Sequence, residues 1–400
     1  NLATIEEYGI NLVPLATFAL EVYGDDPCEE FLPKLLPGNE MDEKTRQLTA
    51  KMHKAISVIQ FKSEAQIFER HPEWDMKDRC IFNSIDYQKG ICTIDGKEYE
   101  MRSCHFPTIN PDNPNAFTEE EQLLMQKLHH SFRISEKLHK HISTMLAHGC
   151  MYAISNSNLL FHAAIPLNDD GSLKELEIYP GKRFSGKELM HNIGMMVRDA
   201  FQSDSTRRDY ARDFFLYLWC GKDSPLFCKS KMATFERYFL KDKDTYKEEK
   251  GNYFKLRDSE EVCDRILDAF GVKGQARHII NGHVPVHASK GENPIKAGGK
   301  LMVIDGGFSE AYHHETGIAG YTLVYHSRGF QLVQHEPFTS ARDAIMREID
   351  IKSTTQIVEM SAHRMLVADT DKGDELRSQI ADLKELLYAY RHGIITEKRR

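Results

Sequence analysis

The 400-residue sequence lacks any long apolar segment and any secretion signal. A membrane-spanning helix needs about 18 or more consecutive apolar residues, and no run in the sequence approaches that length. The N-terminal residues do not show the charged, apolar and small-residue regions of a signal peptide. These absences argue against a membrane or secreted protein, and we expect a cytoplasmic one.

The sequence also lacks paired cysteines and an excess of positive charge. Its eight cysteines are scattered and form no C-x-x-C pair, which favours reduced thiols over a disulfide framework. The net charge of -8 argues against a general nucleic-acid-binding protein. The length suits two or three globular domains, or one large domain with insertions.

Residues 1–150 are predicted to form a helical segment with a small β insert. The apolar period changes from that of helices to that of strands at about 80–101, which predicts a small hairpin or meander. Thr118 and Glu121 then form the pattern of a capping box. This pattern predicts the start of one long helix, from Glu119 to about His148.

Residues 151–340 are predicted to alternate strands with helices. Apolar runs at 158–162 and 277–281 are separated by a long, largely helical crossover, which is typical of parallel or mixed pairing in an α/β fold. A third apolar run follows at 301–304. Residues 341–400 are predicted to be a helical C-terminal extension.

Two histidines directly follow two of these apolar runs. His162 ends the first run, and His283 follows the second after Gly282, which could allow the backbone to turn sharply. Side chains just past the carboxyl ends of neighbouring strands can converge, and neutral imidazoles suit Zn, Mn or Fe. Each histidine also has an ordinary alternative: His162 as a core histidine bonded to backbone, His283 as a surface residue of a turn.

Several longer segments match those of a known family. FHAAIPL, which contains His162, is similar to the H-G-G strand end of calcineurin-like metallophosphoesterases, and NGHVPV, which contains His283, is similar to their final G-H motif. LWCGKDSPLF, KLMVIDGGFS and DLKELLYAYRHGII resemble the class 3 fructose-1,6-bisphosphatases of bacteria. This resemblance covers nearly the whole chain.

The resemblance implies both a fold and an activity. The fold would be α/β, the C-terminal part of a calcineurin-like metallophosphoesterase mixed β-sheet with helices, with a helical and β-hairpin insert and a C-terminal helix. The activity would be gluconeogenic removal of the 1-phosphate of fructose 1,6-bisphosphate with a pair of divalent metal ions, typically Mn²⁺. By the family motifs, His162 and His283 would hold the second of these ions.

Residues beside the motifs are candidates for supporting roles. Lys222, Lys290 and Lys296 lie in predicted loops and could bind substrate phosphate, because phosphate charge needs cationic neighbours. The ordinary alternative for each of them, a solvated surface lysine, is favoured. Asp305 could orient an imidazole, or could simply form the turn ahead of two glycines.

Three motifs of the resembled family are absent from this sequence. Its D-x-H, G-D-x-x-D-R and G-N-H motifs supply the first metal's ligands, the bridging carboxylate and the general acid, and they lie upstream of the matching region. Because the chain also starts at Asn1 inside an expected helix, we expect an N-terminally truncated piece that is inactive alone and whose partner is the missing part.

Two alternatives to this activity stay open. One is another calcineurin-like phosphomonoesterase, such as a protein phosphatase. The other is a regulatory or assembly piece without catalysis. Self-association is left open, and neither nucleic acid nor a membrane is an expected partner.

Overall fold

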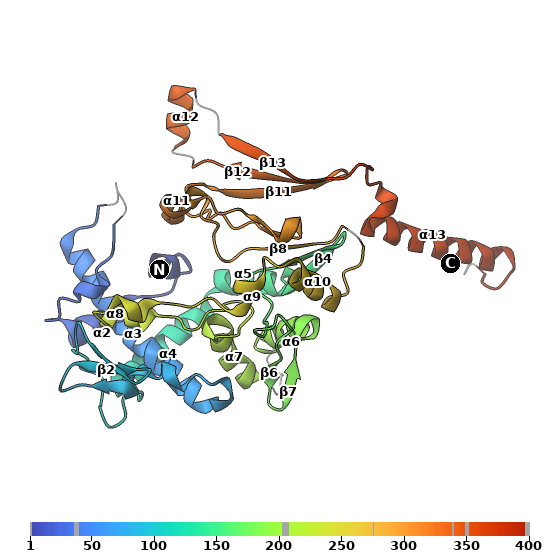
Figure 1. Cartoon of the computed structure of the whole chain (residues 1–400). Coiled ribbons are helices and arrows are strands. Elements are labelled where there is room, and N and C mark those ends of the chain that lie inside the picture. The colour runs from blue at the N-terminus through green and yellow to red at the C-terminus, as the bar shows by residue number, and fades with distance from the viewer. Residues whose placement is uncertain are drawn as a thin grey trace. The chain divides into compact units, whose positions relative to one another are not determined.

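A computed structural model describes residues 2–35, 40–201, 208–274, 276–337, 340–348 and 352–396. The chain forms two compact units, which combine Asn1–Cys150 with Gly194–Gly251 and Met151–Ile193 with Asn252–Arg400. Helices and strands are mixed along the chain, which confirms the predicted α/β class (Figure 1). The finer assignment to a calcineurin-like sheet and the three-part domain division stay predictions.

The first unit is mainly helical around a core rich in aromatic side chains. Its longest helix, α3 (Glu43–Arg70), begins after Asp42, whose carboxylate accepts a hydrogen bond from the backbone N–H of Thr45 at 3.0 Å. This is an N-cap of the usual kind, because the carboxylate satisfies an amide that has no partner inside the helix. The other helices of this unit are α1 (Leu2–Glu7), α2 (Val13–Tyr23), α4 (Glu119–Ile134), α5 (Glu136–His148), α7 (Arg208–Cys220) and α8 (Thr234–Phe239), and α6 (Gly186–Asp199) crosses the unit boundary.

The first unit also contains a small antiparallel sheet. Its strands are β1 (Ile85–Asp86), β2 (Ile91–Ile94) and β3 (Lys97–Glu100), in the order β1-β2-β3. It therefore lies in the segment where the sequence predicts a β insert.

The predicted long helix from Glu119 to His148 is wrong in one respect, because it is two helices, α4 and α5. Between them Ser135 has an extended backbone (ψ 97°), and its hydroxyl donates a hydrogen bond to the carbonyl of Tyr8 at 2.6 Å. A serine side chain that bonds to backbone elsewhere competes with the helical hydrogen-bond pattern. The predicted capping box is confirmed: Thr118 Oγ1 accepts from the Glu121 N–H at 3.2 Å, and the Glu121 carboxylate accepts from the Thr118 N–H at 2.9 Å.

The second unit is built on a five-stranded sheet in the order β4-β5-β8-β10-β9. The three central strands, β5 (Asn158–Phe161), β8 (His278–Asn281) and β10 (Leu301–Val303), are parallel to one another. The edge strands β4 (Tyr152–Ser155) and β9 (Ile295–Lys296) are antiparallel to their neighbours. The predicted mixed pairing is thus confirmed, and it brings three strand ends to one edge of the sheet.

A second, antiparallel sheet packs on the first through apolar side chains. It consists of β11 (Gly320–His326), β12 (Gly329–His335) and β13 (Ser353–Met360). The sequence did not predict β13, so the prediction of a helical extension over 341–400 is wrong at this strand. The buried residues between the two sheets are Ile280, Met302 and Phe330.

Shorter elements complete the second unit. They are the two-stranded β6 (Leu176–Tyr179) and β7 (Lys182–Phe184) and the helices α9 (Asn252–Leu256), α10 (Glu260–Ala269), α11 (Glu310–Thr316), α12 (Ala341–Arg347) and α13 (Asp371–Arg391). Helix α10 contacts β8 and buries its apolar residues. None of the described helices has the length and apolar character needed to cross a membrane.

Candidate functional site

Three parallel strands of the second unit deliver three predicted residues to one edge of the sheet. His162 follows β5, His283 follows β8 and Asp305 follows β10. Backbone hydrogen bonds tie the segments together beyond the strands: the Gly282 N–H donates to the His162 carbonyl at 2.8 Å, and the Val286 N–H to the Asp305 carbonyl at 2.8 Å. Because the carboxyl ends of parallel strands meet at one edge, local sequence is enough to bring these side chains together.

The imidazoles of His162 and His283 face each other directly. Nε2 of His162 lies 3.1 Å from Nδ1 of His283, and the ring centroids are 5.0 Å apart with the planes at 68°. His162 is exposed and His283 half-buried, so His162 is not the core histidine of the ordinary alternative. The pair can share a proton between two nitrogens or present two lone pairs to a cation.

The backbone of His283 is in the left-handed region, with φ at +71°. Such a conformation is uncommon for a residue with a Cβ and costs of order 1–3 kcal/mol, and it clusters at functional sites. The sequence placed the sharp turn at Gly282, but a Cβ added there would only meet Asp305 Cβ at 3.5 Å, an ordinary contact. The turn is therefore made by the histidine itself, which directs its imidazole toward His162.

Asn281 supports this arrangement and was not singled out from the sequence. Its buried side-chain NH₂ donates to the carbonyl of Ala163 and to the hydroxyl of Tyr253, both at 2.9 Å. It thereby joins the end of β8 to the residue after His162 and to α9. The sequence did contain a signal for this residue, an amide side chain at the end of an otherwise apolar run. A buried polar group needs a specific hydrogen-bond partner, so such a residue indicates a defined contact.

Asp305 acts as a turn residue in this structure. Its Oδ1 accepts a hydrogen bond from the Gly307 N–H at 3.0 Å. Forming the turn ahead of two glycines is one of the two roles that the sequence allowed for Asp305. Its role in orienting an imidazole stays a prediction.

The three candidate lysines lie in different surroundings. Lys290 is exposed at the end of a short 3₁₀ turn, and Lys222 is exposed in the first unit. Lys296 is largely buried, with Nζ 3.3 Å from Oε1 of Glu292, and Oε2 of the same carboxylate accepts from the His287 N–H at 3.1 Å. Burial raises the pKa of Glu292, but these partners outweigh it and hold the pKa below its usual value. Lys296 thus already has an anionic partner, and the phosphate role of all three lysines stays a prediction.

The distance between the two imidazole nitrogens fits two ligands of one divalent transition metal ion. Metal–nitrogen bonds of about 2.1 Å place two ligand nitrogens about 3.0 Å apart at a right angle and about 3.4 Å apart at a tetrahedral angle. The observed 3.1 Å lies between these values. Within the described part of the chain, no group of three or more His, Cys, Asp or Glu residues could hold a metal ion. The described residues therefore supply two ligands and not a complete site.

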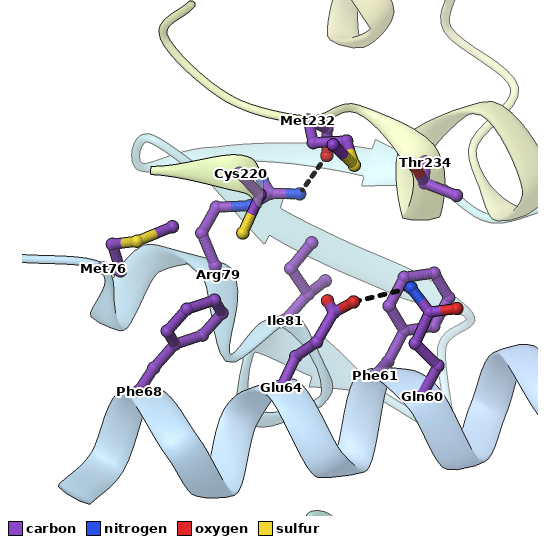
Figure 2. Close-up of a pocket in the computed structure, with 10 residues that line it drawn as sticks. All are labelled: Gln60, Phe61, Glu64, Phe68, Met76, Arg79, Ile81, Cys220, Met232 and Thr234. Atoms are coloured by element: carbon purple, nitrogen blue, oxygen red, sulfur yellow. Dashed lines mark hydrogen bonds between the residues drawn. The ribbon is translucent and has the colours of Figure 1, made fainter. Parts of the chain in front are cut away.

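A separate pocket in the first unit is too small for a sugar phosphate. Figure 2 shows Glu64 beneath Arg79, with the Gln60 amide donating to the Glu64 carboxylate at 2.6 Å. Burial raises the pKa of Glu64, while Arg79 is engaged with the carbonyl of Met232 and the carboxylate of Glu236. The cavity volume of about 20 Å³ suits about one water molecule.

Comparison with known proteins gives a consistent result. A family model described as Firmicute fructose-1,6-bisphosphatase matches residues 1–392. A Phocaeicola vulgatus protein named fructose-1,6-bisphosphatase class 3 is 60% identical over 403 residues, covering 100% of this chain and 60% of that protein. Proteins of the same name from Parabacteroides distasonis and Clostridium tetani are 57% and 52% identical, with 100% and 99% of this chain and 60% of each protein covered. The chain thus spans about 60% of the length of these relatives, and no solved structure matches it.

Proposed function

Because the chain belongs to the fructose-1,6-bisphosphatase family, we propose that its protein hydrolyses fructose 1,6-bisphosphate to fructose 6-phosphate and phosphate, with His162 and His283 holding a divalent metal ion. The observation that carries the site assignment is the approach of two imidazole nitrogens to 3.1 Å at the carboxyl edge of a parallel sheet. The family resemblance makes Mn²⁺ the expected ion.

In this proposal, residues of the chain bind the metal ion and hold its ligands in position. His162 would ligate through Nε2 and His283 through Nδ1, and both atoms must be free of a proton to do so. The left-handed backbone at His283 and the amide of Asn281 hold the two strand ends in register. When bound, a divalent ion supplies charge that stabilises the phosphoryl oxygens and activates water for attack.

The remaining ligands and the acid for the leaving sugar oxygen would come from residues outside these 400. Two imidazoles do not complete a coordination sphere, and the D-x-H, G-D-x-x-D-R and G-N-H motifs do not occur in this sequence. The relatives that match the whole chain are longer than it. We therefore assign to this chain one side of the metal centre.

Metal binding tests the site independently of activity. Mn²⁺ titration of the 400-residue chain followed by electron paramagnetic resonance should show saturable uptake, and His162→Ala and His283→Ala should each abolish it. His314→Ala, which removes an exposed histidine of α11, is the matched control and should bind like wild type. Uptake that survives both site substitutions would remove the pair from the metal centre.

Phosphate release tests the reaction. With saturating Mn²⁺, the protein extended to the length of its relatives should release phosphate from fructose 1,6-bisphosphate, and the 400-residue chain should release little. His283→Ala should reduce turnover by more than the ~10–100-fold typical for loss of a residue that only supports a ligand. A preference for phosphopeptides over the sugar would favour the protein-phosphatase alternative.

A further inference from the structure

Arg257 of the second unit is a buried cation without a close anionic partner. It directly follows α9 and is 5% exposed. Its Nη1 is buried and has no hydrogen-bond partner among the described residues. Its Nη2 lies 3.9 Å from Oε1 of Glu292, which is too long for a hydrogen bond. Burying a charge without such partners is costly, so a guanidinium in this state is a candidate for binding an anion.

A second cation lies beside this arginine. Nζ of Lys296 is 3.3 Å from Oε1 of Glu292, the same oxygen that Arg257 faces. The two segments are joined at the neighbouring residues, because Asp258 Oδ1 accepts a hydrogen bond from the Ala297 N–H at 2.9 Å. Among the described residues, Glu292 is the only carboxylate that forms an ion pair with either cation. Two positive charges therefore face one negative charge, and one positive charge is left unbalanced.

The guanidinium of Arg257 is oriented by an aromatic ring. Its central carbon lies over the ring of Phe254, 5.1 Å from the ring centroid. An arginine stacked on a ring keeps its N–H donors along its edge, where two of them can bind one phosphate side by side. A lysine binds phosphate as a point charge. The two side chains together therefore suit one phosphate group, with a fork from Arg257 and a charge from Lys296.

This cation pair lies at the same edge of the sheet as the histidine pair. The Val303 N–H, at the end of β10, donates to the carbonyl of Pro294 at 2.9 Å, and Glu292 lies two residues farther along the antiparallel segment. Glu292 in turn accepts from the N–H of His287, four residues after His283. Four residues of extended chain span at most ~14 Å. This is the length scale of a six-carbon sugar with a phosphate at each end.

We propose that Arg257 and Lys296 bind the sugar phosphate that is not hydrolysed, while the histidine pair faces the phosphate that is. The assignment of the two phosphates to the two pairs rests on the proposed function, whereas the binding of a phosphate monoester by the cations does not. Glu292 has two effects in this site. It holds the cations close together in the free protein, and its negative charge opposes the incoming phosphate.

Binding of fructose 6-phosphate to the 400-residue chain tests the site without catalysis. Isothermal titration calorimetry in EDTA, which removes divalent ions, should show saturable binding that is tighter than that of inorganic phosphate and absent for fructose. Arg257→Gln and Lys296→Gln should each weaken it by roughly 10–100-fold, the loss expected for hydrogen bonds to a charged group. Lys255→Gln, which removes an exposed cation two residues from Arg257, is the matched control and should bind like wild type.

Glu292→Gln separates a binding site from a structural ion network. The substitution keeps both cations and removes the opposing charge, so fructose 6-phosphate should bind about tenfold more tightly. A network that only joins α9 to β9 would lose stability without any gain in affinity. This variant also decides the question where Arg257→Gln does not fold, because it removes neither cation.

His283→Ala distinguishes this inference from the proposed function. In EDTA it should leave the binding of fructose 6-phosphate unchanged, because the histidine pair takes no part in it. In the protein extended to the length of its relatives, Arg257→Gln should lower kcat/KM for fructose 1,6-bisphosphate but not for fructose 1-phosphate, which lacks the second phosphate. An equal loss for both substrates would overturn the assignment of the two phosphates.

Three results of the calorimetry would overturn the site itself. They are no saturable binding of fructose 6-phosphate up to about 10 mM, unchanged affinity in a folded Arg257→Gln protein, and no gain of affinity in Glu292→Gln. Inorganic phosphate that binds as tightly as fructose 6-phosphate would overturn the assignment to the sugar. Loss of Mn²⁺ uptake by the chain with sugar phosphate binding intact would refute only the proposed metal site.

Discussion

The buried ion pair between Lys62 and Glu121 gives a quantitative prediction for the first unit. Lys62 Nζ lies 2.7 Å from Glu121 Oε2, and both side chains are 0% exposed. Lys62 also donates to the carbonyl of Thr108 at 2.7 Å, and Glu121 also caps α4 through the Thr118 N–H. The substitution Glu121→Gln keeps the size of the side chain and its acceptor for the cap, but removes the negative charge.

The expected loss is about 3–5 kcal/mol of the free energy of unfolding, because breaking a buried pair leaves an uncompensated charge. The loss should depend on pH. Burial lowers the pKa of Lys62, and the carboxylate of Glu121 raises it. In Glu121→Gln only burial acts, so the pKa of Lys62 in the folded variant is lower than in wild type. The folded variant then binds fewer protons than the unfolded chain above the folded-state pKa of Lys62, and its stability rises with pH in that window. The defect should therefore be smaller at pH 9 than at pH 7.

Urea unfolding followed by circular dichroism measures this prediction. Glu120→Gln, which removes an exposed charge one residue away on the same helix, is the matched control and should change stability by no more than ~0.5 kcal/mol. The double variant Lys62→Met/Glu121→Gln should recover most of the loss, since no uncompensated charge then remains buried and the acceptor of the cap is kept. A Glu121→Gln protein within ~1 kcal/mol of wild type would refute the reasoning, and so would a double variant as unstable as the single one.

Three further outcomes follow from the structure. Burial lowers the pKa of His278 although Glu359 lies 2.8 Å from it. The unfolded chain therefore binds more protons than the folded one, and the free energy of unfolding should fall as the pH drops below ~6.5. Thermal melts from pH 8 to 5 should show a weaker pH dependence of the melting temperature in His278→Gln than in wild type. Cys150 is exposed whereas the other seven thiols are at least partly buried, so brief iodoacetamide treatment should label it first by mass spectrometry, and simultaneous labelling of all eight would contradict the fold. His283→Gly should be more stable than His283→Ala by ~0.5–1 kcal/mol in urea, because relief of the left-handed backbone (~1–2 kcal/mol) exceeds the added chain entropy (~0.5–1 kcal/mol); the reverse order would mean that the backbone there is unstrained.

The strand ends around the site could be predicted because each depends on local sequence. An apolar run followed by a polar residue marks where a buried strand stops, and a helical crossover makes its neighbour parallel. These two rules predict that His162 and His283 converge, whereas the position of Asp305 at the same edge is a finding of the structure. The strain at His283 could not be predicted in this way, because a flanking glycine offered the simpler turn.

The buried lysines of α3 show where sequence reasoning fails. Lys51, Lys54 and Lys62 are buried, yet on a charged helical background they resemble solvated residues. Their partners are distant in sequence: Lys54 pairs with Asp26 at 2.7 Å across 28 residues, and Lys51 donates to three backbone carbonyls at and just after the end of α2. Strand β13 escaped prediction for a related reason, since most of its residues are exposed and its sequence does not alternate apolar and polar residues.

The histidine pair was only partly predictable from local sequence. Its position follows from the strands, but its geometry depends on a left-handed backbone and on a buried amide that holds the neighbouring strand end. A turn with no function could relax that strain, for instance with a glycine at position 283. This backbone places Nδ1 of His283 3.1 Å from Nε2 of His162, the arrangement that the proposed two-nitrogen ligand set needs. For the proposed metal site this gives a physical reason to keep a strained residue at position 283, because pre-positioned ligands lose less freedom on binding.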